Sequence, residues 1–189
     1  MAQIIKKELK IVNQDSSIHK YNNETCPEAG NIYKKLAQNV GCTCLTYLYE
    51  NLVDNEKFIY SSNQLWLDLF IDKKLINNCP ITLLTFNFLE EKPFESILLP
   101  WYLAPPINEA EKKVSNLMLE FNIANGISYV SKKSNDRESL ALGGERGDKY
   151  FYKNFIYNIK LFNNTLKQMR AIIMNKVTEF RGKEICEFT

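Results

Sequence analysis

The aromatic residues Trp66 and Phe70 lie four positions apart in a segment that is expected to be a helix. Residues four positions apart in a helix lie on the same face, so both rings would meet one common surface. Cys79 follows thirteen residues after Trp66 and begins a Cys-Pro-Ile step. We expect the two rings and Cys79 to wall a shared apolar cavity between a sheet and its covering helices.

Motifs for catalysis and metal binding are missing from the sequence. His19 is the single histidine, in a polar stretch away from any motif, so we expect an ordinary surface residue. Cys42 and Cys44 have the spacing of half a metal site, but no second pair completes it, which favours core packing. The glycine-rich segment 143–147 lacks the Lys-Ser/Thr of a phosphate-binding loop. We expect no enzyme, cofactor or metal, although residues far apart in sequence could assemble a site that no motif reveals.

Length and composition fit one compact domain. The chain has 189 residues, of which 45% are hydrophobic and 24% charged, as is typical of a globular protein with one core. No apolar run is long enough for a signal peptide or a membrane span, so we expect a cytoplasmic protein without membrane contact. Its five cysteines are expected to be free thiols: Cys26, Cys42, Cys44, Cys79 and Cys186.

Positive charge is concentrated near the C-terminus. Residues 149–183 hold eight lysines and arginines against one acidic residue, whereas the whole chain has a net charge of +2. Lys153, Lys160 and Lys167 recur every seven residues, which fits a solvated helix face better than a surface for nucleic acid. Residues 177–189 are too few for a helix-turn-helix. We therefore expect no sequence-specific DNA binding by this chain alone.

Hydrophobic periodicity and turn residues predict helices that flank a group of strands. A capping box from Thr25 to Glu28 and the N-cap residue Asn108 mark two helix starts, and Gly41 marks a helix end. In the first half of the chain we expect a helix over 27–40, strands over 43–50 and 57–61, and a helix from Ser62 or Asn63 to residue 74. A strand over 81–90 and an irregular connection over 91–106 follow. The second half is expected to hold a helix over 109–123, a hairpin of strands over 126–132 and 138–142, and a helix over 148–176. This order indicates an α/β protein, an α-β-α sandwich around an antiparallel or mixed sheet.

The expected last helix carries a sustained apolar stripe with spacings of three and four residues. The stripe is Phe151, Phe155, Ile159, Phe162, Leu166, Met169 and Ile173. Because it is longer than one sheet face needs, we expect part of it to form a homodimer.

Three segments carry a family resemblance. Trp66, the aromatic Phe70 and the step that begins at Cys79 resemble the Trp, Tyr and Asp-Pro-Val/Ile pattern of LuxR-type autoinducer-binding domains. The stretches NVGCTCLTYLYE and EFNIANGISYVSKKSNDRESLALGG are similar to that family's aromatic strand after a helix and to its later polar hairpin. The resemblance implies a sensor domain over 18–176, with an N-terminal extension over 1–17 and a C-terminal tail over 177–189.

The resemblance implies that the sandwich holds an acyl-homoserine lactone between the sheet and one helix layer. Trp66 would donate its indole N–H to a ligand carbonyl, and Phe70 would line the acyl chain. The family's aspartate is Cys79 here and its tyrosines are Ser62 and Phe70, so polar recognition of a lactone amide is largely missing. The implied ligand-binding positions are Tyr47, Tyr60, Ser62, Trp66, Phe70, Cys79, Phe94, Trp101 and Ala141.

Two functions follow from the resemblance. In the first, the chain is a quorum-sensing domain that binds an acyl-homoserine lactone or a less polar analogue and regulates transcription without catalysis. In the second, it needs no ligand and modulates full-length LuxR-type regulators by dimerisation. A cavity between sheet and helices would favour the first.

Overall fold

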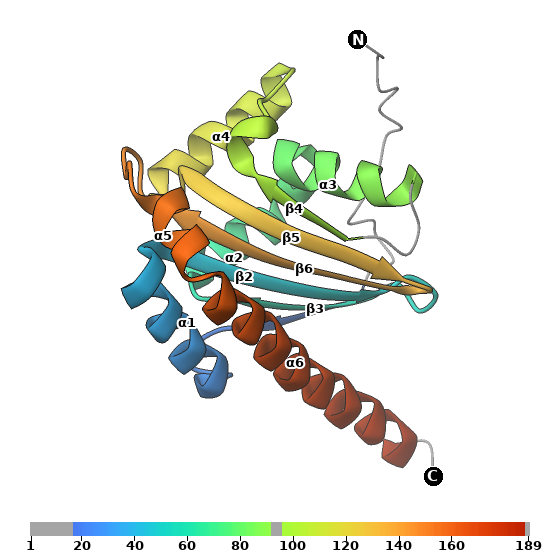
Figure 1. Ribbon diagram of the computed structural model, residues 1–189. Coiled ribbons are helices and arrows are strands. Elements are labelled where there is room, and N and C mark those ends of the chain that lie inside the picture. The colour runs from blue at the N-terminus through green and yellow to red at the C-terminus, as the bar shows by residue number, and fades with distance from the viewer. Residues whose placement is uncertain (1–16, 92–95, 188–189) are drawn as a thin grey trace.

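The computed structural model describes residues 17–91 and 96–187, which form a six-stranded mixed sheet with helices on both faces (Figure 1). The strands lie in the order β1-β3-β2-β6-β5-β4, with β1 and β3 parallel and the other neighbours antiparallel. The strands are β1 (Ser17–Tyr21), β2 (Cys42–Asn51), β3 (Glu56–Ser61), β4 (Ser96–Pro100), β5 (Asn125–Lys133) and β6 (Asp136–Gly144). The helices are α1 (Pro27–Val40), α2 (Gln64–Asp72), α3 (Pro80–Glu91), α4 (Glu109–Glu120), α5 (Phe151–Tyr157) and α6 (Ile159–Glu187), with 3-10 turns η1 (Leu75–Asn78) and η2 (Trp101–Leu103). The expected α-β-α sandwich is confirmed.

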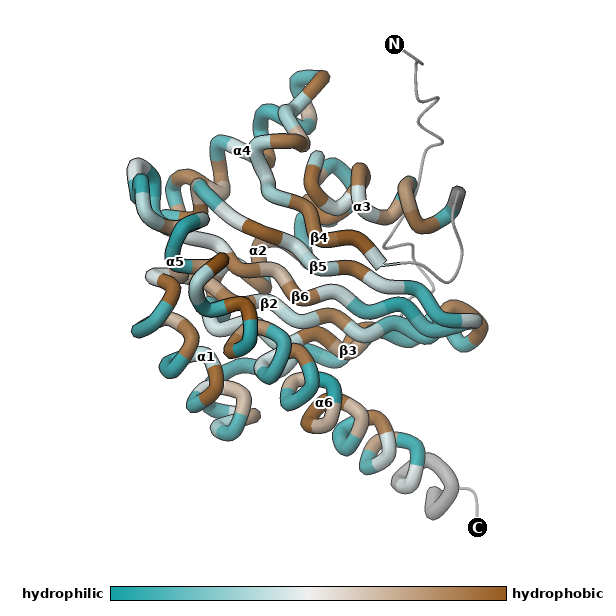
Figure 2. Tube along the Cα trace, viewed as in Figure 1, coloured by the Kyte–Doolittle hydropathy of each residue, from teal (hydrophilic) through white to brown (hydrophobic). Residues whose placement is uncertain are grey.

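Each face of the sheet has its own helix layer and its own apolar core. Helices α1, α5 and α6 cover one face, here called the α6 face, and α2, α3 and α4 cover the other, here called the cavity face (Figure 1). Side chains alternate along a strand, so Leu45 and Tyr47 of β2 face α6 whereas Cys44 and Leu48 face the other layer. Figure 2 shows hydrophobic colour along the middle of the strands and hydrophilic colour toward the β5–β6 turn.

Capping residues place the helices largely as expected. The Asn63 and Asn108 side chains each accept a hydrogen bond from the backbone N–H three residues later, at 3.0 and 2.9 Å, and so begin α2 and α4. Gly41 ends α1 with a φ of 82°, which favours glycine. The capping box expected at Thr25 is wrong, because Cys26 is the N-cap and makes no capping bond, while Thr25 bonds within the preceding turn.

Residues 81–90 lie in helix α3, so the strand expected there is wrong. Ile81, Thr85 and Leu89 are buried at spacings of four, which is a helical pattern. A short apolar run does not distinguish a buried helix from a buried strand by periodicity alone. The connection expected over 91–106 also contains strand β4, which pairs with β5.

Strand β1 has no counterpart among the expected elements, and it places His19 in a packed position. The imidazole stacks on Phe58 with ring centroids 4.6 Å apart and lies 4.1 Å from the ring of Phe180. His19 is therefore a half-buried member of an aromatic cluster between the sheet and α6.

The expected last helix is interrupted at Asn158, which separates α5 from α6. Six of the seven stripe residues are buried against the α6 face of the sheet, and Ile159 beside the break is 36% exposed. The stripe therefore covers this chain's own core, which removes the reason for expecting a dimer through it. Helix α6 also continues past residue 176 to Glu187, and Val177 is buried in the same core.

Residues two positions apart in a regular strand lie on the same face of the sheet, but Cys42 and Cys44 lie on opposite faces. The pairing of β2 with β6 shifts register between them, which marks a β-bulge. Cys42 lies in the core under α1, whereas Cys44 lies in the core under α2 and α4. Both are buried, as expected for cysteines that pack in a core.

A hydrogen-bonded carboxylate joins α6 to the sheet, and it makes stability depend on pH. Burial opposes the charge of Glu138, but hydrogen bonds from Arg170 and from the Tyr47 hydroxyl at 2.7 Å outweigh it and lower the pKa of Glu138. A carboxyl whose pKa is lower in the folded than in the unfolded protein stabilises the fold above the unfolded pKa, and this stabilisation is lost as the pH falls through the folded pKa.

We therefore expect Glu138→Gln to lower the melting temperature at neutral pH and to matter less and less below about pH 5. Melting curves of the wild type and the variant from neutral to acidic pH measure this. A difference in melting temperature that stays constant over the whole range would contradict it.

Candidate functional site

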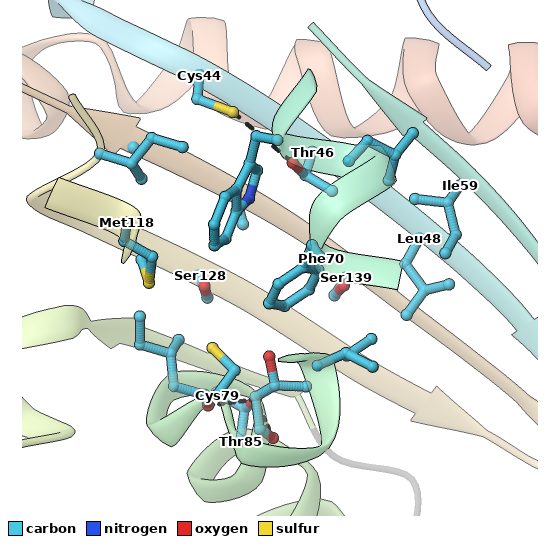
Figure 3. Close-up of a pocket in the computed structure, with 18 of the residues that line it drawn as sticks. Cys44, Thr46, Leu48, Ile59, Phe70, Cys79, Thr85, Met118, Ser128 and Ser139 are labelled. Carbon is cyan, nitrogen blue, oxygen red and sulfur yellow. Dashed lines mark hydrogen bonds between the residues drawn. The ribbon is translucent and has the colours of Figure 1, made fainter. Parts of the chain in front are cut away.

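A cavity of about 90 Å³ lies between the cavity face of the sheet and the layer of α2, α3 and α4 (Figure 3). Trp66 and Phe70 line it from one face of α2, and their ring centroids are 5.0 Å apart. Cys79 lines it from the end of η1, directly before α3. The structure thus brings together the three residues expected to wall a shared cavity.

Strand pairing arranges the sheet floor of this cavity in rows, because paired residues point to the same side. The hydroxyl row consists of Ser61, Thr46, Ala141 and Ser128 on β3, β2, β6 and β5. The apolar row, next toward the β5–β6 turn, consists of Ile59, Leu48, Ser139 and Val130 on the same four strands. Figure 3 shows Ser128, Ser139 and Thr46 around the space that the Phe70 ring enters. The floor is therefore more polar at one end than at the other.

Trp101 closes the floor beside the hydroxyl row. Its indole packs against β5 and β6 at two glycines, where a Cβ on Gly126 would overlap ring carbons and a Cβ on Gly143 would lie 3.3 Å from the ring. The indole N–H donates to the Ser128 hydroxyl at 2.8 Å. Residues without a side chain are thus needed where the indole meets the sheet.

None of the described residues that line the cavity carries a formally charged side chain at neutral pH. Burial raises the pKa of the Cys79 and Cys44 thiols, so both are neutral at physiological pH. The polar groups of the lining are hydroxyls, thiols and indole N–H groups. This composition can orient an uncharged ligand by hydrogen bonds and offers no partner for an ion.

The other residues expected in the site divide into those that the structure brings to the cavity and those that it does not. Trp101 and Ala141 line it with the first three. Tyr47 and Tyr60 lie on the α6 face, where their hydroxyls donate to Glu138 and Asn23 at 2.7 and 2.6 Å, so neither reaches the cavity.

Two more expected residues, Ser62 and Phe94, are not among the described residues that line the cavity. The Ser62 hydroxyl accepts the backbone N–H of Leu45 at 2.9 Å, and Ser62 is not among the lining residues. Phe94 lies outside the described residues.

Sequence reasoning missed several lining residues, because the side to which each strand residue points depends on pairing. Thr46, Leu48 and Ser128 line the floor, and Thr85 and Phe86 line the α3 wall. Alternation along β2 contained part of the signal, since residues 44, 46 and 48 had to share a face opposite to Tyr47. The α3 residues were missed because the apolar run over 81–90 fits a strand as readily as a buried helix.

A largely apolar cavity between a sheet and one helix layer is typical of a small-molecule-binding domain. Solved structures with the same fold include a LuxR family transcription factor. No family model matches the sequence, and no curated protein matches it either. No helix in the described part of the chain is long and apolar enough to cross a membrane, and no cluster of metal-ligating residues occurs in that part.

Three solved structures illustrate the structural similarity of this chain to known proteins. The N-acylhomoserine-lactone-dependent LuxR family transcription factor CepR2 from Burkholderia cenocepacia matches with a TM-score of 0.53 and 12% identity, over 79% of this chain and 88% of that one. The VqsR ligand-binding domain from Pseudomonas aeruginosa matches with a TM-score of 0.52 and 13% identity, over 76% and 87%. SdiA in complex with octanoyl-rac-glycerol matches with a TM-score of 0.52 and 11% identity, over 78% of this chain and 59% of that one. The chain has the fold of a LuxR-type ligand-binding domain.

Proposed function

We propose that this chain is a regulatory, non-catalytic signal-binding domain of LuxR type that holds a small uncharged amphipathic ligand in the cavity beside Trp66. The observation that carries the proposal is the apolar cavity walled by Trp66, Phe70 and Cys79 within this fold. Trp66 lines this cavity, and its indole N–H would donate to a ligand carbonyl. CepR2 is described as dependent on an N-acylhomoserine lactone, and SdiA is solved with octanoyl-rac-glycerol.

The cavity is smaller than the roughly 300 Å³ at which sites for drug-sized ligands begin. A ligand with an acyl chain therefore has to displace side chains of the lining. Since Cys79 is a weak acceptor, the ligand amide of an acyl-homoserine lactone would gain little there. A less polar analogue with an ester or ketone carbonyl suits the cavity better.

Replacing Trp66 by alanine should weaken ligand binding about tenfold or more, because it removes both the ring contact and the N–H donor. Titrations with octanoyl-homoserine lactone and octanoylglycerol, followed by calorimetry, measure the effect, and native mass spectrometry of protein purified from cells identifies a bound ligand. Phe155→Ala is the matched control, because it removes a buried aromatic ring from the α6 face and leaves the cavity intact. Equal affinity of wild type and Trp66→Ala for these compounds would count against the proposal.

The second candidate function, pairing with LuxR-type regulators without a ligand, is favoured by the surface of α5. Tyr150, directly before α5, and Ile156 and Tyr157 within it are 64%, 67% and 75% exposed, and the Lys153 ammonium lies 6.0 and 5.8 Å from the two tyrosine rings, so a partner could cover this mixed surface. Residues 177–187 continue α6, so they supply no separate recognition helix for DNA.

Analytical ultracentrifugation of this chain tests self-association through the surface, and a mixture with a full-length LuxR-type regulator tests the pairing itself. We expect a homodimer at tens of micromolar and a monomer for Ile156→Asp, because a charge in a buried interface is costly. A wild-type monomer at that concentration would contradict self-association, and the absence of a mixed species with the regulator would count against this second function.

A further inference from the structure

We propose that a buried charged row behind Phe86 fixes the far end of the cavity and so sets the longest acyl chain that the domain accepts. The inference rests on the proposed function and adds the feature that selects the ligand by the length of its acyl chain. Phe86 lines the cavity from α3 and is 1% exposed. The guanidinium of Arg137, which does not line the cavity, lies over this ring with its central carbon 3.8 Å from the ring centroid.

The charged row is the third row of the cavity face and follows directly after the apolar row. It consists of Lys57, Glu50, Arg137 and Lys132 on β3, β2, β6 and β5. The first three are buried, at 0%, 4% and 3% exposure, and none of the four lines the cavity. The cavity therefore stops at the point where the floor changes from aliphatic to ionic.

Ion pairs hold this row in place. Lys57 Nζ lies 2.8 Å from one Glu50 oxygen, and Arg137 Nε donates to the other at 2.8 Å. Arg137 also lies 3.6 Å from Glu90 on α3. A hydrocarbon terminus that entered the row would separate buried charges without replacing their hydrogen bonds, which is far more costly than moving an apolar side chain.

The order of the rows also gives the ligand an orientation. Its carbonyl end belongs at the hydroxyl row, near Trp66, Trp101 and Ser128, where donors are present. Its chain then runs along the apolar row past Leu48 toward Phe86. The class of ligand that fits is an uncharged molecule with one linear acyl chain, and its affinity should rise with chain length up to a sharp limit.

A chain-length series tests the inference. Purified protein is titrated with saturated monoacylglycerols and N-acyl-homoserine lactones from butanoyl to tetradecanoyl, each below its aggregation concentration. Phe86→Ala should move the preferred length upward by about two or more carbons, because truncation opens space in front of Arg137. Phe86→Leu should move it in the same direction by less and serves if the alanine variant does not fold. Leu89→Ala is the matched control, since Leu89 is buried on the same helix without lining the cavity.

The outcomes separate the inference from the function on which it rests. A sharp length limit in the wild type and in Leu89→Ala, shifted upward in both Phe86 variants, supports it. If all four proteins bind with the same length limit, Phe86 and the charged row do not set that limit, and the proposed function still stands. A wild type that binds no member of either series overturns both.

Discussion

Replacing Glu50 by alanine should lower the free energy of unfolding by about 3–5 kcal/mol, because it leaves two buried cations without their shared carboxylate. Glu50 pairs with Lys57 and Arg137, and all three side chains are almost completely buried. A buried ion pair adds little net stability compared with an apolar group of the same shape, but the removal of one partner exposes the full desolvation cost of the other. Urea unfolding of the wild type and Glu50→Ala, followed by circular dichroism, measures the loss.

Asp72→Ala provides the matched control for this prediction. Asp72 also pairs with a lysine, Lys20, at 2.6 Å, but its side chain is 62% exposed. An exposed pair contributes about 0–1 kcal/mol. If Glu50→Ala costs no more than Asp72→Ala, the buried row does not have the energetic role given to it here, and a wall of fixed charges behind Phe86 loses its support.

Replacing Gly126 by alanine should destabilise the protein by about 1–3 kcal/mol and displace the Trp101 indole from the sheet. A Cβ at this position would overlap ring carbons of Trp101, and the surrounding sheet leaves the backbone little room to move. Displacement would also break the hydrogen bond from Trp101 to Ser128 and should shift tryptophan emission to longer wavelength. Thermal unfolding and fluorescence spectra measure the two effects.

Gly182→Ala is the control for the glycine substitution. Gly182 lies in α6 with nothing within 4 Å of an added Cβ, so alanine there should stabilise the helix by up to about 1 kcal/mol. A Gly126→Ala variant with wild-type stability and emission would show that the indole does not need the glycine surface.

Local sequence signals predicted the elements that depend on short-range physics. The four-residue spacing of Trp66 and Phe70 placed both rings at one cavity, and Asn63 and Asn108 marked helix starts because an N-cap acts within one turn. The break at Asn158 could not be predicted, because the apolar spacing continues across it without interruption.

The composition of the site depended on information that one sequence does not contain. Tyr47 was expected at the ligand, but the face to which a strand residue points is fixed by the sheet that forms around it. The rows of the cavity floor come from the register of four strands that are separated by up to about a hundred residues. The residues next to Glu50 and Arg137 in the sequence do not indicate that these two side chains lie beside each other in the sheet.

The bulge between Cys42 and Cys44 gives this chain two natural reporters on two sides of the sheet. Burial raises the pKa of the Cys42 thiol to about 12, and it also raises the pKa of the Cys44 thiol, so either one reacts with an alkylating agent only after its surroundings open. Cys42 becomes accessible when α1 separates from the sheet, and Cys44 when α2 and α4 do. If the two helix layers open in separate local unfolding events, the two alkylation rates measure the opening of each layer independently. A molecule that occupies the cavity would slow the second rate and leave the first unchanged.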